Sequence, residues 1–198
     1  MTAISLIYMA SGRGKRFGSN KLLTPLHDTP LYQYGLDTLY AVSKAHAWSL
    51  LVVTAYTEIA AWCHEKQIRV IINDQADEGM AASLRLGVTH TPHATTWAFF
   101  PADQPLLRQH SIEAFLDGFE KSPCTVGAMS NGIRPMSPAV FTSQHKAELL
   151  AQQGDTGGRQ ILKKYNGHIY LYCPNPDELL DIDTLEDKKR CLSKMRKR

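Results

Sequence analysis

The sequence predicts an α/β protein in which a mostly parallel, twisted sheet is covered by helices on both faces. Apolar runs alternate along the chain with segments whose apolar residues recur at helical spacing, and this alternation is typical of parallel sheets with right-handed crossovers. The apolar runs are continuous, as burial on both faces of a sheet requires. With 198 residues, 43% of them hydrophobic, the chain fits one domain with a sizeable core. We therefore expect a single three-layer αβα domain over residues 1–198.

The elements are expected in the following order. ISLIYMA, at residues 4–10, predicts the first strand, and segment 30–43 predicts a helix because apolar residues from Leu31 to Val42 recur at roughly helical spacing. From Ser122 onward prolines interrupt the pattern, and neither a repeat nor a linker marks a domain boundary. The other expected strands cover residues 49–56, 69–73 and 96–103, and the other expected helices cover 58–67, 79–88 and 110–121.

Charge and cysteine usage exclude several classes of function. The net charge is +3, and much of the excess lies in the C-terminal KKRCLSKMRKR. This tail is short for a nucleic-acid-binding arm, so we interpret it as a solvated helix end and expect no nucleic-acid partner. The four cysteines form no C-x-x-C pair, which argues against a zinc site or a disulfide framework and favours a reducing cytoplasm. The first strand is too short for a membrane span and no signal-peptide n-region precedes it, so we expect no membrane partner.

The loop after the first strand, SGRGKRFGSNK at residues 11–21, contains three glycines and four cationic side chains. In open α/β sheets, ligands bind outside the carboxyl ends of the strands, where this loop and PADQP at 101–105 are expected to lie. Glycines let successive backbone amides point at an anion, while Arg and Lys supply charge, so a triphosphate fits best. The glycine spacing matches neither a Walker A loop nor G-x-G-x-x-G. On these residues alone, a solvated basic turn remains the alternative.

The run ASGRGKRFGSNKLL, at residues 10–23, resembles the signature A-A-G-x-S-x-R-M-G-x-x-K-L-L of the molybdenum cofactor cytidylyltransferase-like nucleotidyltransferases. Further blocks follow in the family's order up to residue 187, which makes the resemblance specific. It implies a Rossmann-like nucleotidyltransferase fold and Mg²⁺-dependent nucleotide transfer. The further blocks are Pro25-Leu26, Pro30-Leu31, Asn73, EGMAASLRLG (78–87), ADQPLL (102–107), GDTGGR (154–159) and DIDTLED (181–187).

The chain also departs from the family pattern. Ser11 replaces the second Ala of the signature, Gly14 replaces a Ser, and Phe17 replaces the usual Met. Where the family commonly shows R-G-H-P on the acceptor side, this chain has RPMSP at residues 134–138, with one residue added and no His. This second departure affects the identity of the acceptor more than the nucleotide chemistry.

The resemblance implies that the first loop, including Ala10 and Ser11, wraps the triphosphate. Gly12 would allow close approach of the phosphates to the backbone. Lys21 would stabilise charge at the α-phosphorus, and Arg16 would hold the phosphates that leave as pyrophosphate. These two cations and Asp103 are the expected catalytic residues.

A second loop and helix are expected to contact the base and ribose through Asn73, Gly79, Met80 and Ser83. The N-terminus of this helix can also donate backbone amides to an anion or to base carbonyls. For Gly79 and Met80, an ordinary loop-to-helix junction is an equal alternative.

Two acidic residues are the expected metal ligands. Asp103 ends an apolar strand and can present its carboxylate to Mg²⁺, which usually takes one or two protein carboxylates together with substrate phosphates and waters. Asp183 resembles the family's second ligand, and Asp181 is a weaker candidate. The alternative for Asp183 is that it, or Thr184, caps the last helix.

Arg134 and Arg159 are the cationic candidates for binding the acceptor's phosphate, although either can be an ordinary surface charge. No general base is expected, because a phosphate monoester is already an anionic nucleophile and positioning with electrostatics supplies most of the catalysis. The eight histidines accordingly form no recognisable constellation.

The resemblance therefore implies transfer of CMP from CTP to a phosphorylated acceptor, with molybdopterin as the expected acceptor and a molybdoenzyme as a possible recipient of the product. The related alternatives are a guanylyltransferase for the same cofactor, a methylerythritol cytidylyltransferase and a sugar-1-phosphate nucleotidyltransferase. An alternative from a different class is a catalytically weakened nucleotide-binding regulator or chaperone of a metalloenzyme.

Overall fold

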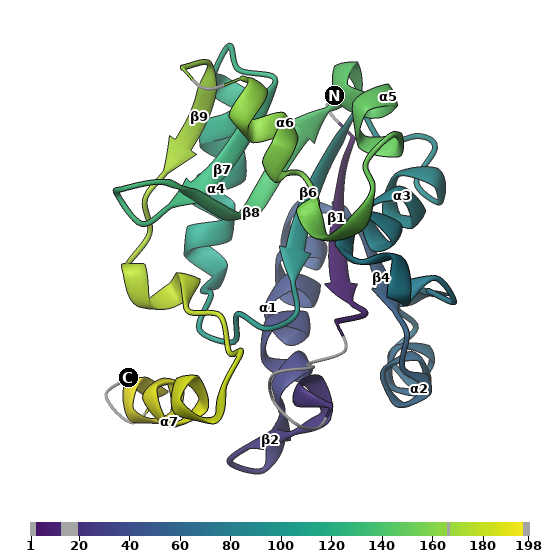
Figure 1. Ribbon diagram of the computed structural model, residues 1–198, viewed down its shortest axis with the longest axis vertical. Helices are drawn as coiled ribbons and strands as arrows, with labels where there is room; N and C mark the ends of the chain where they lie inside the picture. Colours follow the sequence, from purple (N-terminus) through teal and green to yellow (C-terminus); the bar gives the residue numbers. More distant parts are fainter. Residues whose placement is uncertain (1–2, 13–19, 166, 196–198) are drawn as a thin grey trace.

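The computed structural model describes residues 3–12, 20–165 and 167–195, and shows a seven-stranded sheet in the order β5-β4-β1-β6-β8-β7-β9 (Figure 1). Only β8 runs antiparallel to its neighbours, so the sheet is mostly parallel, as predicted. The strands are β1 (Ile4–Ala10), β4 (Ser49–Thr54), β5 (Arg69–Ile72), β6 (Thr96–Pro101), β7 (Val126–Ser130), β8 (Pro135–Thr142) and β9 (Ile169–Tyr172), and a separate hairpin pairs β2 (Pro25–Leu26) with β3 (Thr29–Pro30).

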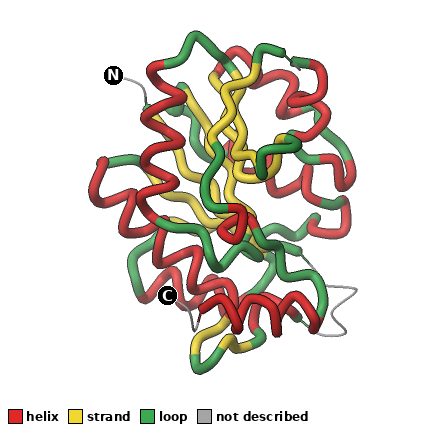
Figure 2. Tube along the Cα trace, turned by 90° about the vertical axis from the view of Figure 1, so that its left-hand side faces the viewer, coloured by secondary structure: helices red, strands yellow, loops and turns green. Residues whose placement is uncertain are grey.

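Helices cover both faces of this sheet, whose strands run through the middle of the molecule (Figure 2). Side chains alternate along β1, so Leu6 and Tyr8 join a core with α1, α2 and α4, whereas Ile7 joins a second core with α3, α5 and α6. Each buried Leu or Ile stabilises the fold by roughly 1.5–3 kcal/mol. The three-layer αβα prediction is thus confirmed. The helices are α1 (Leu31–His46), α2 (Thr57–Glu65), α3 (Met80–Thr89), α4 (Gln109–Lys121), α5 (Lys146–Leu150), α6 (Arg159–Lys164) and α7 (Leu185–Met195).

The predicted elements before residue 122 are all present, with ends that differ by a few residues. The strand expected over 96–103 ends at Pro101, because a proline lacks the N–H that would continue the ladder. Ala102 N still donates to the Met9 carbonyl of β1 at 3.1 Å, and the chain continues from Asp103 as a loop. This early ending directs the Asp103 carboxylate beyond the strand end.

Three strands after residue 122 were not predicted. The prolines that obscured β8 occupy positions that a sheet tolerates. Pro135 is the first residue of the strand, and Pro138 follows a cis peptide bond where the register between β7 and β8 shifts. The interruption of the apolar pattern here reflects a bulged antiparallel strand rather than a loop.

The strand order creates a crevice beside β1. After β1 the chain builds β4 and β5 on one side, and then returns through α3 to form β6 on the other side. At such a switch point the connections leave in opposite directions, which opens a ligand site at the carboxyl ends of the strands. In Figure 1 the arrowheads of β1 and β6 point toward the same edge, where α7 also lies. Among the described residues, no helix has the length and apolar character needed to cross a membrane.

Candidate active site

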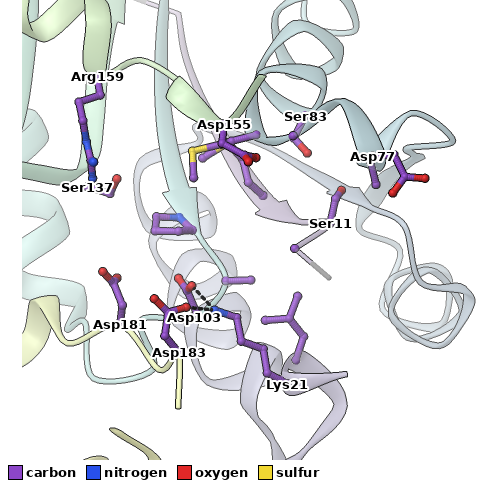
Figure 3. A pocket seen from close by; sticks show the side chains of 18 residues that line it. Ser11, Lys21, Asp77, Ser83, Asp103, Ser137, Asp155, Arg159, Asp181 and Asp183 are labelled. Atoms are coloured by element: carbon purple, nitrogen blue, oxygen red, sulfur yellow. Dashed lines mark hydrogen bonds and ion pairs between the residues drawn. The ribbon is translucent and has the colours of Figure 1, made fainter. Parts of the chain in front are cut away.

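A cavity of about 530 Å³ opens at the carboxyl ends of β1 and β6. Figure 3 shows its lining side chains, which come from segments spread from β1 to the loop before α7. Lys21 and three carboxylates gather at one end, and Gly79 lies at the other end beside Met80 and Asp155. We call these the charged end and the glycine end. The lining residues used below are Ser11, Gly12, Lys21, Asp77, Gly79, Met80, Ser83, Asp103, Ser137, Asp155, Arg159, Asp181 and Asp183.

The charged end is organised around Lys21, whose ammonium lies between two carboxylates. Its Nζ is 2.7 Å from Asp103 Oδ2 and 2.7 Å from Asp183 Oδ1, and Figure 3 draws both contacts as dashed lines. The Lys21 side chain is only 8% exposed. Burial on its own lowers the pKa of Lys21, but the attraction of Asp103 and Asp183 outweighs it and raises the pKa above the usual value. Lys21 is therefore a positive charge throughout the physiological pH range.

The chain presents these three groups from unrelated local structures. Lys21 begins a short 3₁₀ turn, η1 (Lys21–Leu23), and Asp103 follows the end of β6. The backbone carbonyl of Asp103 accepts a hydrogen bond from Ile182 N at 3.0 Å. This bond joins the β6 loop to the DIDT segment, and so brings Asp183 to the same point.

Thr184, rather than Asp183, caps helix α7. Asp187 Oδ2 accepts hydrogen bonds from Thr184 N at 2.9 Å and Thr184 Oγ1 at 2.7 Å, while Asp187 N donates to Thr184 Oγ1 at 3.1 Å. This reciprocal arrangement is a capping box with Asp in the place of the usual Glu. Of the two residues that the sequence offered as caps, Thr184 is therefore the one that caps, and the Asp183 side chain contacts Lys21.

Asp181 is a third carboxyl group at the charged end. Gln104 Nε2 donates to Asp181 Oδ1 at 2.9 Å and to the carbonyl of Ser137 at 3.2 Å, so one amide links three segments. Burial and the nearby charge of Asp103 raise the pKa of Asp181 to about 6, although the Gln104 hydrogen bond opposes this rise. Because the residue as a whole is exposed, solvent screens these effects and we take about 6 as an upper limit.

At the glycine end, the loop before α3 packs directly against the 154–158 loop. Gly79 has φ +86°, and a Cβ there would lie 2.4 Å from Asp155 Oδ1 and 2.6 Å from the Gly154 carbonyl carbon. Gly157, with φ +51°, would place a Cβ 2.7 Å from the Met80 sulfur. Both positions require glycine for conformation and for space. The GDTGGR block is therefore shaped to fit against the start of α3.

Arg85, which lies outside the cavity, connects these two loops. Its guanidinium donates to the backbone carbonyl of Gln152 at 2.8 Å and forms an ion pair with Glu78. Glu78 ends the short turn η2 (Ala76–Glu78), which leads into α3. These contacts hold the loop before α3, which the sequence predicts to bind the nucleotide, against the loop that contains the GDTGGR block.

The structure brings most of the predicted site residues to this cavity. Those lining it are Ser11, Gly12, Lys21, Gly79, Met80, Ser83, Asp103, Asp183 and Arg159. A Cβ at Gly12 would meet no atom within 4 Å, and the Gly12 carbonyl accepts a 2.7 Å bond from Tyr56 Oη. Figure 3 shows the Arg159 side chain reaching toward Ser137. Arg16 lies outside the described residues.

Three predicted residues occupy other positions. Ala10 is fully buried at the end of β1, and its carbonyl accepts a bond from Thr54 Oγ1. Asn73 is 2% exposed and donates to Ser83 Oγ at 3.0 Å, so it supports a lining residue instead of lining the cavity itself. Arg134 is exposed on the turn between β7 and β8, away from the lining residues. Of the two predicted acceptor-binding arginines, Arg159 alone lines the cavity.

Sequence reasoning overlooked three residues that line the cavity, Asp77, Ser137 and Asp155, and Gln104, which binds the lining residue Asp181. Asp155 lies within the recognised GDTGGR block, and Gln104 lies within the ADQPLL block, so a residue-by-residue reading of those blocks identifies both. Asp77 and Ser137 carry no comparable signal. Their contribution depends on how the loops around η2 and β8 fold over the strand ends.

Comparison with known proteins identifies the family of this chain. Residues 6–169 match the MobA-like NTP transferase domain. The chain belongs to this family. It is 25% identical over 195 residues to the purine catabolism protein PucB of Bacillus subtilis, an alignment that covers 91% of this chain and 92% of PucB. It is 26% identical over 189 residues to a probable molybdenum cofactor guanylyltransferase of Thermococcus gammatolerans, covering 90% and 94%. A protein of the same description from Thermococcus kodakarensis is 32% identical over 139 residues, covering 68% and 65%.

Solved structures agree with this MobA-like fold. The protein Rv0371c of Mycobacterium tuberculosis superposes with a TM-score of 0.80 at 23% identity, over 97% of this chain and 98% of that one. The molybdopterin-guanine dinucleotide biosynthesis protein A of Archaeoglobus fulgidus superposes with a TM-score of 0.72 at 16% identity, over 98% and 100%. At these identities the likeness establishes the fold. Together with the family match, it makes the chain a nucleotidyltransferase-type α/β protein.

Proposed function

We propose that this protein transfers a nucleoside monophosphate from a nucleoside triphosphate to a small phosphorylated acceptor and releases pyrophosphate. The observation that carries the proposal is the charged end of the cavity, where Lys21 lies 2.7 Å from Asp103 and 2.7 Å from Asp183 at the strand ends. Phosphoryl chemistry depends on positioning and on stabilising charge rather than on covalent catalysis. A buried cation flanked by two carboxylates supplies charges of both signs for this purpose.

Asp103 and Asp183 are the residues we propose to hold Mg²⁺. Among the described residues, no group of three or more His, Cys, Asp or Glu side chains forms a preformed metal site. Two carboxylates nevertheless fit Mg²⁺, because it completes its shell with substrate phosphates and waters. Asp103 Oδ1 is buried without a hydrogen-bond partner, so this carboxylate has an oxygen available to bind the ion. A Rv0371c structure with manganese supports divalent-metal use in this fold. The bound ion would neutralise phosphate charge.

The protein's own groups have separate tasks in this proposal. The backbone at Ser11 and Gly12 faces the phosphates, and Lys21 stabilises charge at the α-phosphorus. Arg16 holds the leaving phosphates, and the wall of Gly79, Met80 and Ser83 receives the base and ribose. The acceptor's phosphate is already anionic, so its positioning by Arg159 replaces a general base.

For the nucleotide we propose CTP, from the resemblance of the first loop and the DIDT block to the cytidylyltransferase-like members. The two Thermococcus relatives are described as probable guanylyltransferases, and this observation favours GTP as the second candidate. For the acceptor we propose molybdopterin, with a molybdoenzyme as recipient of the product. We propose that the protein works in the cytoplasm as a single domain.

The first test is thermal stability with CTP, GTP, ATP or UTP, each with and without Mg²⁺. A ligand at about a hundred times its Kd stabilises the fold by about 2.7 kcal/mol, which raises the Tm by roughly 5–10 °C at about 2–4 °C per kcal/mol. We expect the largest shift with CTP and Mg²⁺. A larger shift with GTP would instead indicate a guanylyltransferase.

Turnover is then measured by pyrophosphate release with the preferred nucleotide and molybdopterin. Release that requires the acceptor supports the transferase. Binding of nucleotide without any release, across phosphorylated acceptors, would favour the alternative of a nucleotide-binding regulator. The absence of a thermal shift with all four nucleotides would reject the proposed function.

A further inference from the structure

We propose that Lys21 occupies the cation position between Asp103 and Asp183 in the nucleotide-free protein, and that it leaves this position only when a triphosphate is bound. Lys21 thereby makes metal binding conditional on the nucleotide. This inference rests on the proposed function, because it concerns the same carboxylates. It adds an order of events to that function, in which the free protein has low affinity for the metal alone.

The geometry shows that Lys21 contacts both carboxylates. Its Nζ contacts one oxygen of each group at 2.7 Å, and the side chain is 8% exposed. Ion pairs on a protein surface are screened and weak, but a buried cation that relieves the repulsion of two carboxylates is not. Figure 3 shows the Lys21 side chain pointing toward both groups, to which dashed lines join its ammonium. It therefore acts as the counterion of both carboxylates.

Lys21 and a divalent ion cannot use the same carboxylate oxygens at once. Mg²⁺ binds carboxylate oxygens at about 2.0–2.1 Å, so an ion on Asp103 Oδ2 or Asp183 Oδ1 would lie in contact with the ammonium, and an ion on the unpaired Asp103 Oδ1 would share a carboxylate with it. Two cations at that separation repel each other strongly in a partly desolvated site. The Lys21 side chain must then move to another anion. In the proposed reaction this anion is the triphosphate, which would become the new partner of the Lys21 ammonium.

The local structure allows this movement without refolding. Lys21 is the first residue of η1, and its backbone carbonyl is held by Thr24 N at 3.2 Å while Leu23 N donates to the Asn20 carbonyl. These bonds fix the backbone, and the four-carbon side chain has several rotatable bonds through which its ammonium can change position while the backbone stays in place. The backbones that carry the two carboxylates are also held, that of Asp103 by Ile182 and that of Asp183 by the capping box. The proposed change is therefore an exchange of partners by the Lys21 side chain.

The test measures Mn²⁺ binding to the nucleotide-free protein by electron paramagnetic resonance of the free ion. We compare the wild type with Lys21→Met, which removes the charge, and Lys21→Arg, which keeps it. Lys21→Met should bind Mn²⁺ on the order of tenfold more tightly, because the competing cation is gone. Lys21→Arg should stay close to the wild type. The double variant Lys21→Met with Asp103→Asn should lose the gain, which locates the ion at these carboxylates.

A second measurement is needed because Lys21→Met leaves two carboxylates without a neutralising cation, which should lower the stability of this variant. Its Tm is recorded with and without Mn²⁺, and the ion should raise it more than it raises the Tm of the wild type. In the wild type, a non-hydrolysable triphosphate analogue should increase Mn²⁺ affinity. Equal Mn²⁺ affinity in the wild type and Lys21→Met, without nucleotide, would overturn the inference. If the wild type still shows a Mg²⁺-dependent nucleotide shift in that case, the proposed function survives and only the inference fails.

Discussion

The two ends of the cavity join distant parts of the chain by opposite means. At the charged end, Lys21 meets Asp103 and Asp183 across 82 and 162 residues of sequence through ion pairs. At the glycine end, Gly79 and Gly157 bring the loops around α3 and α6 together because neither has a side chain. The charged end is held together by ion pairs, whereas the glycine end depends on the absence of side chains that would clash.

This difference determines which substitutions each end tolerates. An isosteric change that removes a charge should disturb the charged end without disturbing the fold. A single added methyl group should disturb the glycine end without any change in charge. The three predictions below test this contrast in order of expected effect.

Asp103→Asn is expected to have the largest effect. The amide keeps the size of the side chain but removes the charge that we propose binds the metal and faces Lys21. Turnover should fall by about a hundredfold or more, which corresponds to about 3 kcal/mol of transition-state stabilisation. The measurement is kcat for pyrophosphate release, with circular dichroism to check folding. Asp28→Asn, the same change at an exposed position of the β2–β3 hairpin, is the matched control. Wild-type turnover in Asp103→Asn would remove the charged end from the mechanism.

Gly79→Ala tests the glycine end against a control with the same positive φ. Gly79 and Gly132 both have φ +86°, but a Cβ at Gly132 meets nothing within 4 Å, whereas a Cβ at Gly79 would clash with Asp155 and Gly154. Both alanine variants incur the backbone cost of about 1 kcal/mol. Gly79→Ala should lose about 1–3 kcal/mol more from overpacking. Urea denaturation measures both free energies of unfolding. Equal losses would show that space at Gly79 is not limiting.

Asp181→Asn is expected to have the smallest effect and to depend on pH. The pKa of Asp181 is raised from 3.8 to about 6 in the folded protein, so the folded state binds its proton more tightly than the unfolded state. Between these values the free energy of unfolding contributed by Asp181 falls as pH rises. Asp181→Asn should therefore be more stable than the wild type at pH 8, by less than about 1 kcal/mol after solvent screening, and this gain should shrink at pH 5.

Asp187→Asn provides a comparison of opposite sign for that experiment. Hydrogen bonds from Thr184 lower the pKa of Asp187, so its contribution to stability is present at neutral pH and is lost as pH falls through the lowered value. Denaturation curves of both variants at pH 5, 6.5 and 8 measure the two trends. The interpretation of Asp181 fails if its variant is destabilised at pH 8.

Sequence alone predicted the sheet and helices up to residue 122, because strands buried on both faces are continuous apolar runs. It also predicted that the loops after β1 and β6 meet, since the carboxyl ends of parallel strands share one edge. It did not predict β7, β8 and β9. Prolines at the start and at the bulge of β8 remove the apolar pattern, although the sheet accepts them there.

For the site, the recognisable blocks identified Lys21, Asp103 and Asp183 as charged groups but not as one another's partners. Only the tertiary structure placed the ammonium between the carboxylates, turned Asn73 inward to Ser83, and left Arg134 on an exposed turn. The physical reason is that periodicity and motif spacing specify what lies locally along the chain. Contacts across 82 and 162 residues depend on strand order, on the backbone bond between Asp103 and Ile182, and on the capping box that directs Asp183 to Lys21.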